Sequence, residues 1–313
     1  MLALEGIAFF ANPGGDEAAI LGCHHGRVYG VAFSADGTLL ASSGNQDGTV
    51  RLYDVASRRE IAVLDGPEGL LLQVALSPDG RLVAVASRKE KVRVWDVQRR
   101  AVLADIETDD TPWSIAFNPD GSLLAVVWAG EARLYDTRSF QAVGSLATGG
   151  GDITFLPDGH AAIMDAFNGQ PLLWDFAKGD LTELEPVNRS ALPIAVDPSG
   201  CWLASAGEEA VYLWDLTTGS LVRSLEGHTD FINDVAFSPD GRLLASSSEK
   251  PMSDTMAATD FTVRLWDVAT GEPVAVLNGH AAQSIMIEFQ PAGSLLATAS
   301  YDGTVRLWPV PQP

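Results

Sequence analysis

A strand–turn–strand pattern recurs along this chain, and it constrains the fold more than any other feature of the sequence. Each copy has an apolar segment, a tight turn that ends in glycine, and a second apolar segment. Successive turn glycines are separated by 43, 41, 38, 41, 41 and 52 residues, and they are Gly37, Gly80, Gly121, Gly159, Gly200, Gly241 and Gly293. A spacing near 40 residues indicates a repeat architecture, because one such unit cannot bury its own faces in water.

The last copy, from Ile287 to Trp308, shows the pattern most fully. Val305 and Leu307 alternate with Thr304 and Arg306, which is the period of two that a half-buried strand requires. In the other copies this third segment ends in an aromatic residue followed by aspartate, as in Tyr53-Asp54, Trp95-Asp96, Tyr135-Asp136, Trp174-Asp175, Trp214-Asp215 and Trp266-Asp267. No segment has a sustained helical period, so the chain is predicted to be all-β.

Charge and cysteine content limit the kinds of partner and environment. The chain has 41 acidic and 20 basic residues among 313, a formal charge of -21, which disfavours binding to nucleic acid or to an anionic membrane. Cys23 and Cys201 are expected to be free thiols on opposite sides of the fold. The apolar N-terminus carries Glu5 and lacks the basic start of a secretory signal, so a cytoplasmic protein is expected.

The repeat motifs resemble those of WD40-repeat proteins, particularly bacterial ones. Gly227-His228, Ser238 to Gly241, Val263 to Asp267, Gly279-His280 and Asp302 to Trp308 stand at the family's spacing. The resemblance extends from about residue 16 to residue 308. It implies one domain over residues 1–313, a seven-bladed β-propeller of four-stranded sheets around a central channel.

Ring closure and two additional segments follow from the same comparison. The last unit ends after its third strand, where Pro309 and Pro311 cannot donate to a ladder, so residues 16–22 are expected to supply the closing strand. Residues 1–15 form an extra N-terminal segment of open role. Residues 249–260 form an insertion in blade six, which is either a partner-binding loop or a tolerated surface loop.

Three histidines are explained by the hydrogen-bonded set that the family carries in its blades. In that set a histidine, a strand hydroxyl, a turn aspartate and a tryptophan satisfy one another and fix the blade. The matching residues here are His24 and Asp47, His228, Asp260 and Trp266, and His280, Asp302 and Trp308. Units two to five lack the histidine and are expected to depend more on apolar packing.

The family also implies a top face, formed by the loops that precede the first strands and those that join second to third strands. Contact positions on this face, transferred by alignment, are Tyr29, Leu72, Arg88, Trp113, Trp128, Phe167, Leu192, Phe231, Asn233, Ile285 and Tyr301. Exposed aromatic residues supply contact area at low entropic cost, so the aromatic members are expected to surround the channel mouth and bind a partner. The alternative for each residue is that it turns inward and fills space between blades.

These features favour a non-catalytic scaffold that binds a protein or peptide through the top face. It is expected to be a monomer unless it is part of a larger assembly. An alternative is a sensor or regulatory propeller of a bacterial multidomain kinase or signalling ATPase system. A propeller enzyme is a third candidate, but the sequence has no nucleophile motif, no phosphate-binding loop and no metal-ligand spacing. No cofactor or metal is therefore expected.

Overall fold

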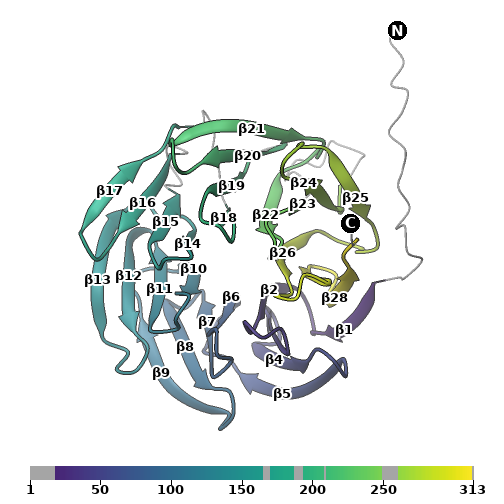
Figure 1. The fold of residues 1–313 in the computed structure, drawn as a ribbon. Coiled ribbons are helices and arrows are strands. Elements are labelled where there is room, and N and C mark those ends of the chain that lie inside the picture. The colour runs from purple at the N-terminus through teal and green to yellow at the C-terminus, as the bar shows by residue number, and fades with distance from the viewer. Residues whose placement is uncertain (1–17, 165–169, 187–192, 208, 249–259, 312–313) are drawn as a thin grey trace.

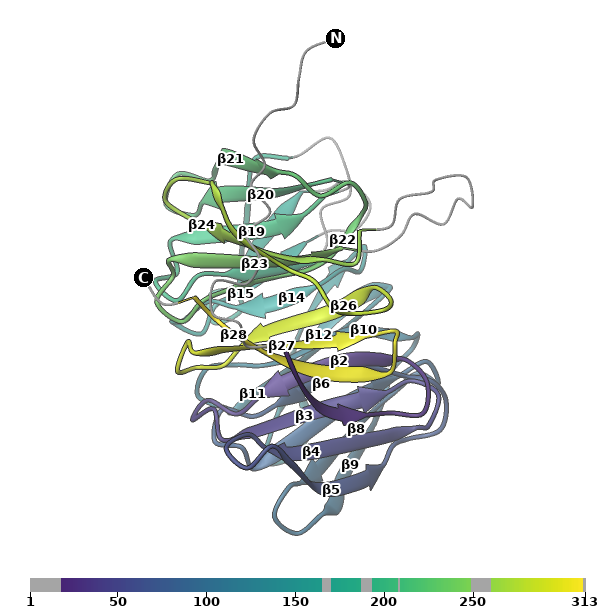
Figure 2. The same ribbon diagram turned by 90° about the vertical axis from the view of Figure 1, so that its right-hand side faces the viewer.

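The computed structural model describes residues 18–164, 170–186, 193–207, 209–248 and 260–311. All regular structure within these ranges is β-strand, which confirms the predicted all-β class (Figures 1 and 2). The strands form sheets arranged around a central opening, so the chain is a β-propeller (Figure 1). No described helix is long and apolar enough to cross a membrane. The predicted segment 1–15 and residues 249–259 of the predicted insertion lie outside the described residues.

In these ranges, 28 strands form seven four-stranded antiparallel sheets. The first three sheets contain β2 (Val28–Phe33), β3 (Leu39–Gly44), β4 (Thr49–Asp54) and β5 (Arg59–Asp65); β6 (Leu71–Leu76), β7 (Leu82–Ser87), β8 (Lys91–Asp96) and β9 (Ala101–Glu107); and β10 (Pro112–Phe117), β11 (Leu123–Trp128), β12 (Gly130–Asp136) and β13 (Ala142–Thr148).

The remaining sheets contain β14 (Ile153–Phe155), β15 (Ala161–Met164), β16 (Pro171–Asp175) and β17 (Asp180–Glu183); β18 (Ile194–Val196), β19 (Trp202–Ala206), β20 (Ala210–Asp215) and β21 (Ser220–Glu226); β22 (Ile232–Phe237), β23 (Leu243–Ser248), β24 (Val263–Asp267) and β25 (Pro273–Leu277); and β26 (Ser284–Phe289), β27 (Leu295–Ser300), β28 (Thr304–Pro309) and β1 (Ala19–Cys23). Each sheet therefore runs from an innermost first strand to an outermost fourth strand (Figure 1).

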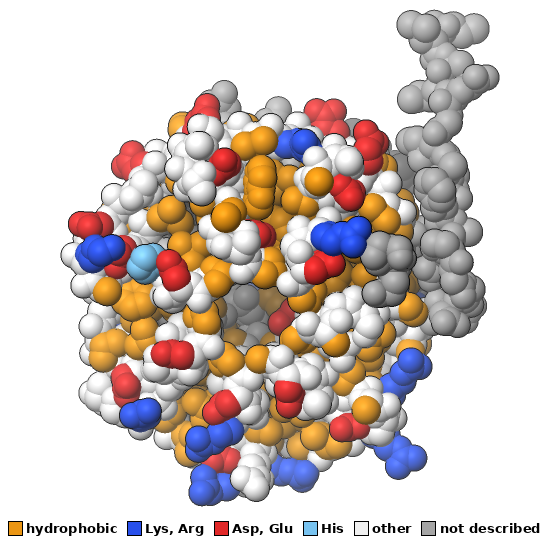
Figure 3. Space-filling view, viewed as in Figure 1, with side chains coloured by type: hydrophobic (Ala, Val, Ile, Leu, Met, Phe, Trp, Pro, Cys, Tyr) orange, Lys and Arg blue, Asp and Glu red, His pale blue; other side chains and the backbone are white. Residues whose placement is uncertain are grey.

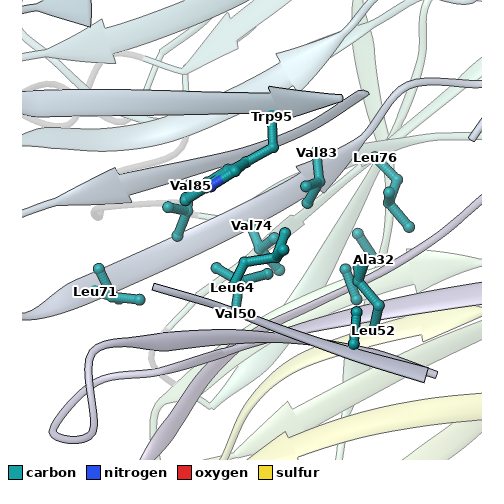
Figure 4. Close-up of a cluster of buried hydrophobic side chains, with 12 residues drawn as sticks. Ala32, Val50, Leu52, Leu64, Leu71, Val74, Leu76, Val83, Val85 and Trp95 are labelled. Atoms are coloured by element: carbon teal, nitrogen blue, oxygen red, sulfur yellow. The ribbon is translucent and has the colours of Figure 1, made fainter. Parts of the chain in front are cut away.

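The hydrophobic core lies between neighbouring sheets. In the cluster of Figure 4, Val50 and Leu52 of β4 face the next sheet, where they meet Val74 of β6 and Val83 of β7. All four side chains are buried. Because every second residue of a strand points to the same face, the alternation seen in the sequence places these apolar residues together. The sheets consequently stack face to face around the ring.

One sheet combines the two ends of the chain. β1 pairs antiparallel with β28, with Ala19 opposite Leu307 and Cys23 opposite Thr304. The backbone N–H of His24 also donates to the carbonyl of Gly303 at 2.9 Å. The strand from the N-terminal part thus covers an edge of the C-terminal sheet that would otherwise expose unpaired backbone groups.

Three sheets each contain a buried set of hydrogen-bonded polar side chains. His228 Nδ1 lies 3.0 Å from an Asp260 carboxylate oxygen, while its Nε2 lies 2.7 Å from Ser246 Oγ. Ser246 Oγ also accepts a 2.8 Å hydrogen bond from Trp266 Nε1. His280 makes the corresponding contacts with Asp302 and Thr298, and Trp308 Nε1 donates to Thr298.

The third hydrogen-bonded set links His24 to Asp47 and Ser42, with Tyr53 in place of the tryptophan. Burial alone would raise the pKa of Asp260, but the hydrogen bonds from His228 and Thr262 outweigh it and lower that pKa. Burial also lowers the pKa of His24 and His228, which favours neutral imidazoles at pH 7.

Candidate partner-binding site at the channel mouth

The innermost strands enclose the central channel. Residues of all seven first strands line a cavity of about 360 Å³, among them Val31, Val74, Ile115 and Val235. The end of the channel where these strands begin opens into a second cavity of about 350 Å³, the channel mouth. The top face is the surface around this mouth.

Local backbone irregularities direct side chains into the mouth. The pairing of first and second strands shifts by one residue at the start of β2, β6, β10, β22 and β26. The skipped residue is Tyr29 in β2, Trp113 in β10, Asn233 in β22 and Ile285 in β26. A β-bulge bends its strand and re-aims the extra side chain, so one repeated irregularity presents these four residues at equivalent points.

Six of the residues predicted to contact a partner line the mouth: Tyr29, Leu72, Arg88, Trp113, Asn233 and Ile285. Trp113 is 52% exposed and provides the largest accessible apolar side chain among them. Leu72 is only 5% exposed and contributes to the wall rather than to open surface. Phe231 is 45% exposed but lies beside the mouth, outside its lining residues.

Tyr301 belongs to a cluster at one edge of the mouth. Its ring centroid is 5.0 Å from that of Tyr29, and the two hydroxyl groups form a hydrogen bond. The Arg27 guanidinium lies 4.3 Å from the Tyr301 ring centroid, within range of a cation–π interaction. The contacts hold the Tyr29 ring in place beside the cavity.

The expected exposure of Trp128 is wrong. Its side chain is 2% exposed and packs in a core cluster with Leu72, Ile115 and Val126. The Arg133 guanidinium lies 4.9 Å from its ring centroid. Trp128 is the last residue of β11, where the strand's alternation still points it between two sheets. The other two predicted contacts, Phe167 and Leu192, lie outside the described residues.

Sequence reasoning missed a polar position at the floor of the mouth. Gln73, Ser114, Asp152 and Asp234 each directly precede the equivalent apolar residue of their first strand. Each of these side chains accepts a hydrogen bond from a backbone N–H of the next sheet. The Ile115 N–H donates to Gln73 at 2.6 Å, Ile153 to Ser114 at 3.3 Å, Ile194 to Asp152 at 3.0 Å and Ile287 to Asp234 at 2.7 Å. The available signal was a polar residue recurring at one position of an otherwise apolar strand.

Three carboxyl groups face the channel without a cationic partner in any described contact. Enclosure by the innermost strands raises the pKa of Asp152, Asp234 and Glu288. The charges of Asp152 and Glu288 add to this effect at Asp234, and the pKa of Glu288 reaches about 8. Glu288 accepts the Phe33 N–H at 2.9 Å, a bond that joins the last sheet to the first.

This site has the chemistry of a binding surface. An apolar and aromatic rim surrounds a polar floor whose side chains are already used to hold neighbouring sheets together. Among the described residues, no group of three or more His, Cys, Asp or Glu side chains could hold a metal ion. The fold and the mouth together define a propeller with a concave, partly apolar cavity at one end of its channel.

Comparison with known proteins places this propeller in a family. The family described as "WD domain, G-beta repeat" (WD40) matches residues 15–54, 58–96, 219–267 and 271–309, which together exceed half of the chain. The chain therefore belongs to the WD40-repeat family. The matched segments include all three polar sets around His24, His228 and His280.

Similar proteins differ in how much of their length this chain covers. THO complex subunit 3 of Arabidopsis thaliana is 27% identical over 296 residues, covering 89% of this chain and 88% of that protein. Serine-threonine kinase receptor-associated protein of Gallus gallus is 23% identical, covering 80% and 69%. Periodic tryptophan protein 2 of Arabidopsis thaliana is 26% identical over 75% of this chain, which spans only 21% of that relative.

Proposed function

We propose that this protein is a non-catalytic scaffold that binds a protein or peptide segment through its top face. The observation that carries this proposal is the set of β-bulges that direct Tyr29, Trp113, Asn233 and Ile285 to one cavity of about 350 Å³. A bulge leaves backbone groups unpaired, so its repetition around one opening favours a role in recognition. Two similar proteins are named as a complex subunit and a receptor-associated protein, which agrees with this function.

We further propose that the seven sheets are the blades of one closed ring, that residues 1–313 form this single domain, and that it acts as a cytoplasmic monomer. The free, exposed thiols of Cys23 and Cys201 support a reducing compartment. The formal charge of -21 supports a protein partner over nucleic acid or an anionic membrane surface.

A second candidate is a sensor propeller that regulates a separate or attached effector, as in bacterial multidomain kinases or signalling ATPases. The observation that favours it is the match to periodic tryptophan protein 2, of which this chain spans only 21%. A propeller like this one can therefore be part of a longer protein. The neighbouring reading frames of the native gene separate the candidates. An adjacent kinase or ATPase frame supports the sensor.

The scaffold proposal is tested with Trp113→Ala and a matched control, Val143→Ala. Val143 is 59% exposed on the outer strand β13, far from the mouth in the sheet order. Proteins captured from the native host by the wild type and both variants are identified by mass spectrometry, and the affinity of each purified candidate is measured by calorimetry. We expect Trp113→Ala to weaken binding at least about tenfold, as at an aromatic hot spot, and Val143→Ala to leave it unchanged. Equal affinities of the wild type and Trp113→Ala, with folding intact, would refute this site.

A further inference from the structure

Positive charge is concentrated in a small part of this acidic chain. Residues 51–100 contain ten Lys and Arg residues against seven Asp and Glu residues, although the whole chain has 20 against 41. Half of all basic residues therefore lie in two adjacent sheets, those of β2–β5 and β6–β9. The remaining sheets carry the strong negative charge.

Five of these arginines lie on the bottom face, which is the face opposite the mouth. In an antiparallel sheet that runs from first to fourth strand, the first and third turns lie at the same end. The basic arc consists of exposed residues at three such turns. They are Arg58 between β4 and β5, Arg59 at the start of β5, Arg81 between β6 and β7, and Arg99 and Arg100 between β8 and β9. Figure 3 shows Lys and Arg side chains gathered along the lower margin, over these strands, with acidic side chains among them.

The described contacts give Arg58, Arg59 and Arg100 no carboxylate partner, whereas the charge of Arg81 contributes to the lowered pKa of Asp79 and Asp96. Arg99 pairs with Asp96 at 2.6 Å, and Arg100 donates to the Ile61 carbonyl at 2.7 Å. Within the described ranges, no carboxylate oxygen lies within 4.0 Å of the charged groups of Arg58, Arg59 and Arg81. In contrast, Arg51 and Arg93, which lie within strands β4 and β8, each pair with a carboxylate at 2.7 Å. The arc is thus built differently from the structural arginines of the same sheets.

Two arginines of the basic arc have an unusual backbone conformation. Arg58 and Arg100 have φ values of 55° and 53°, in the left-handed region that disfavours side chains with a Cβ. The same turn position is glycine in three other sheets, at Gly179, Gly219 and Gly271. Two neighbouring sheets therefore place arginine where the fold itself favours glycine. Phe140 holds this position in the next sheet with φ 54°, so the turn accommodates a side chain, and in the two basic sheets that side chain is an exposed arginine.

We propose that the basic arc binds an acidic peptide segment of a protein partner, independently of the top face. Exposed guanidinium groups can pair with carboxylates in two-point hydrogen bonds, and unpaired ones do so without first losing an internal partner. Because the two faces are opposite, one molecule can hold an acidic partner at the arc while the mouth is occupied.

Charge favours a short acidic peptide over nucleic acid. At physiological ionic strength, charges more than about 8 Å apart are largely screened, so a peptide held at the arc experiences mainly the local positive charge. A nucleic acid extends at high charge density past the arc and over the acidic sheets, where it is repelled. The arc is therefore suited to a limited run of carboxylates.

The test uses fluorescein-labelled decaglutamate, measured by fluorescence anisotropy with the full-length protein at several salt concentrations. Labelled decaglutamine and a ten-nucleotide single-stranded DNA serve as neutral and alternative anionic probes. The variant Arg58→Gly/Arg100→Gly removes two charges and relieves the backbone at both turns. Its control is Phe140→Gly, which changes the same turn position in the next sheet, at φ 54°, without changing charge.

We expect the double variant to bind decaglutamate about five- to tenfold more weakly, with a smaller salt dependence, while its thermal midpoint stays equal or rises. Phe140→Gly should leave decaglutamate binding unchanged, whereas its midpoint should fall, because the lost ring packs against a core cluster. Undetectable binding of decaglutamate to the wild type, equal binding by the double variant, or equal binding of decaglutamine would overturn the proposal. Tighter binding of the DNA with the same arginine dependence would overturn it in favour of a nucleic-acid surface. Trp113→Ala should not alter decaglutamate binding, which separates this result from the fate of the top-face proposal.

Discussion

Ser246 and Ser205 occupy the same position in two neighbouring sheets. Among the described residues, the Ser246 hydroxyl forms hydrogen bonds and the Ser205 hydroxyl does not. Both side chains are fully buried. Ser246 Oγ accepts the Trp266 indole N–H, so its own hydrogen is available to His228 Nε2. Ser205 Oγ has no hydrogen-bond partner among the described residues. One serine completes a network, whereas the other is a buried polar group without compensation.

Ser246→Ala should lower the free energy of unfolding by roughly 2–4 kcal/mol, because it removes partners from two buried groups. Ser205→Ala is the matched control and should leave stability within about 0.5 kcal/mol of the wild type or increase it, since a hydroxyl without a partner is lost. Urea denaturation measures both. Equal destabilisation by the two substitutions would contradict the role assigned to the network.

Glu288 makes stability depend on pH in the direction opposite to that of Asp260, because the fold raises the pKa of Glu288 and lowers that of Asp260. Its pKa rises from 4.5 to about 8 in the folded protein, so the folded state holds a proton that the unfolded state releases. The corresponding stability is fully present below about pH 4.5 and is lost as the pH rises towards 8. The raised pKa values of Asp152 and Asp234 act with the same sign.

Glu288→Gln should therefore stabilise the protein at pH 8 by roughly 1–3 kcal/mol and have little effect near pH 4.5. The amide oxygen can still accept the Phe33 N–H, so the contact between sheets is retained. Unfolding is followed by denaturant titration from pH 4.5 to 8.5, with the exposed Glu68→Gln as control. Parallel stability curves for Glu288→Gln and the wild type would show that the carboxyl is not protonated by folding.

At the scale of elements, glycine in β2 sets how closely two sheets approach. A Cβ on Gly30 would lie 2.8 Å from the Val74 backbone nitrogen and 2.9 Å from Ser43 Oγ. The Val74 nitrogen belongs to the neighbouring first strand, which cannot move independently of its sheet. A side chain at residue 30 would therefore separate β2 from β6 beside the mouth.

Gly30→Ala should destabilise the fold by about 1–3 kcal/mol through this overpacking. The control is Gly144→Ala on the outer strand β13, where the nearest atom to the new Cβ is Leu134 Cδ1 at an ordinary 3.7 Å. We expect the control to be neutral or slightly stabilising, because alanine restricts the unfolded chain. Thermal unfolding compares the two variants, and a Gly30→Ala midpoint at or above that of Gly144→Ala would refute the close-approach argument.

At the scale of the whole molecule, the pairing of β1 with β28 joins segments almost 300 residues apart in sequence. Leu21 of β1 is 7% exposed and packs with Val305 and Leu307. Without β1, the polar groups at the edge of β28 and this apolar surface would face water. The pairing that joins the two ends of the chain therefore depends on one five-residue strand.

A variant that begins at His24 should unfold at least about 5 °C below the full chain and associate with itself through the exposed edge. A synthetic peptide covering residues 16–23 should restore much of the lost stability, whereas a scrambled peptide should not. Calorimetry measures the midpoints and light scattering the association. Unchanged midpoints in the shortened chain would show that the pairing contributes little to the ring.

The sequence by itself determined the repeat, the all-β class and the identity of the buried polar sets. These depend on local chemistry: a period of two, glycine in tight turns, and histidine, aspartate and tryptophan at fixed spacing. Most of the predicted top-face positions also reach the mouth, because repeat alignment transfers a place in the strand from one unit to the next.

Only the tertiary structure decided what those positions do. Trp128 is buried because the adjacent sheet covers it, and Trp113 is exposed because a bulge turns it outward. The carboxyl groups of Asp152 and Asp234 face one channel only after separate sheets meet around it. Exposure, register and the approach of distant carboxyl groups depend on packing between sheets, which a pattern within one repeat does not encode.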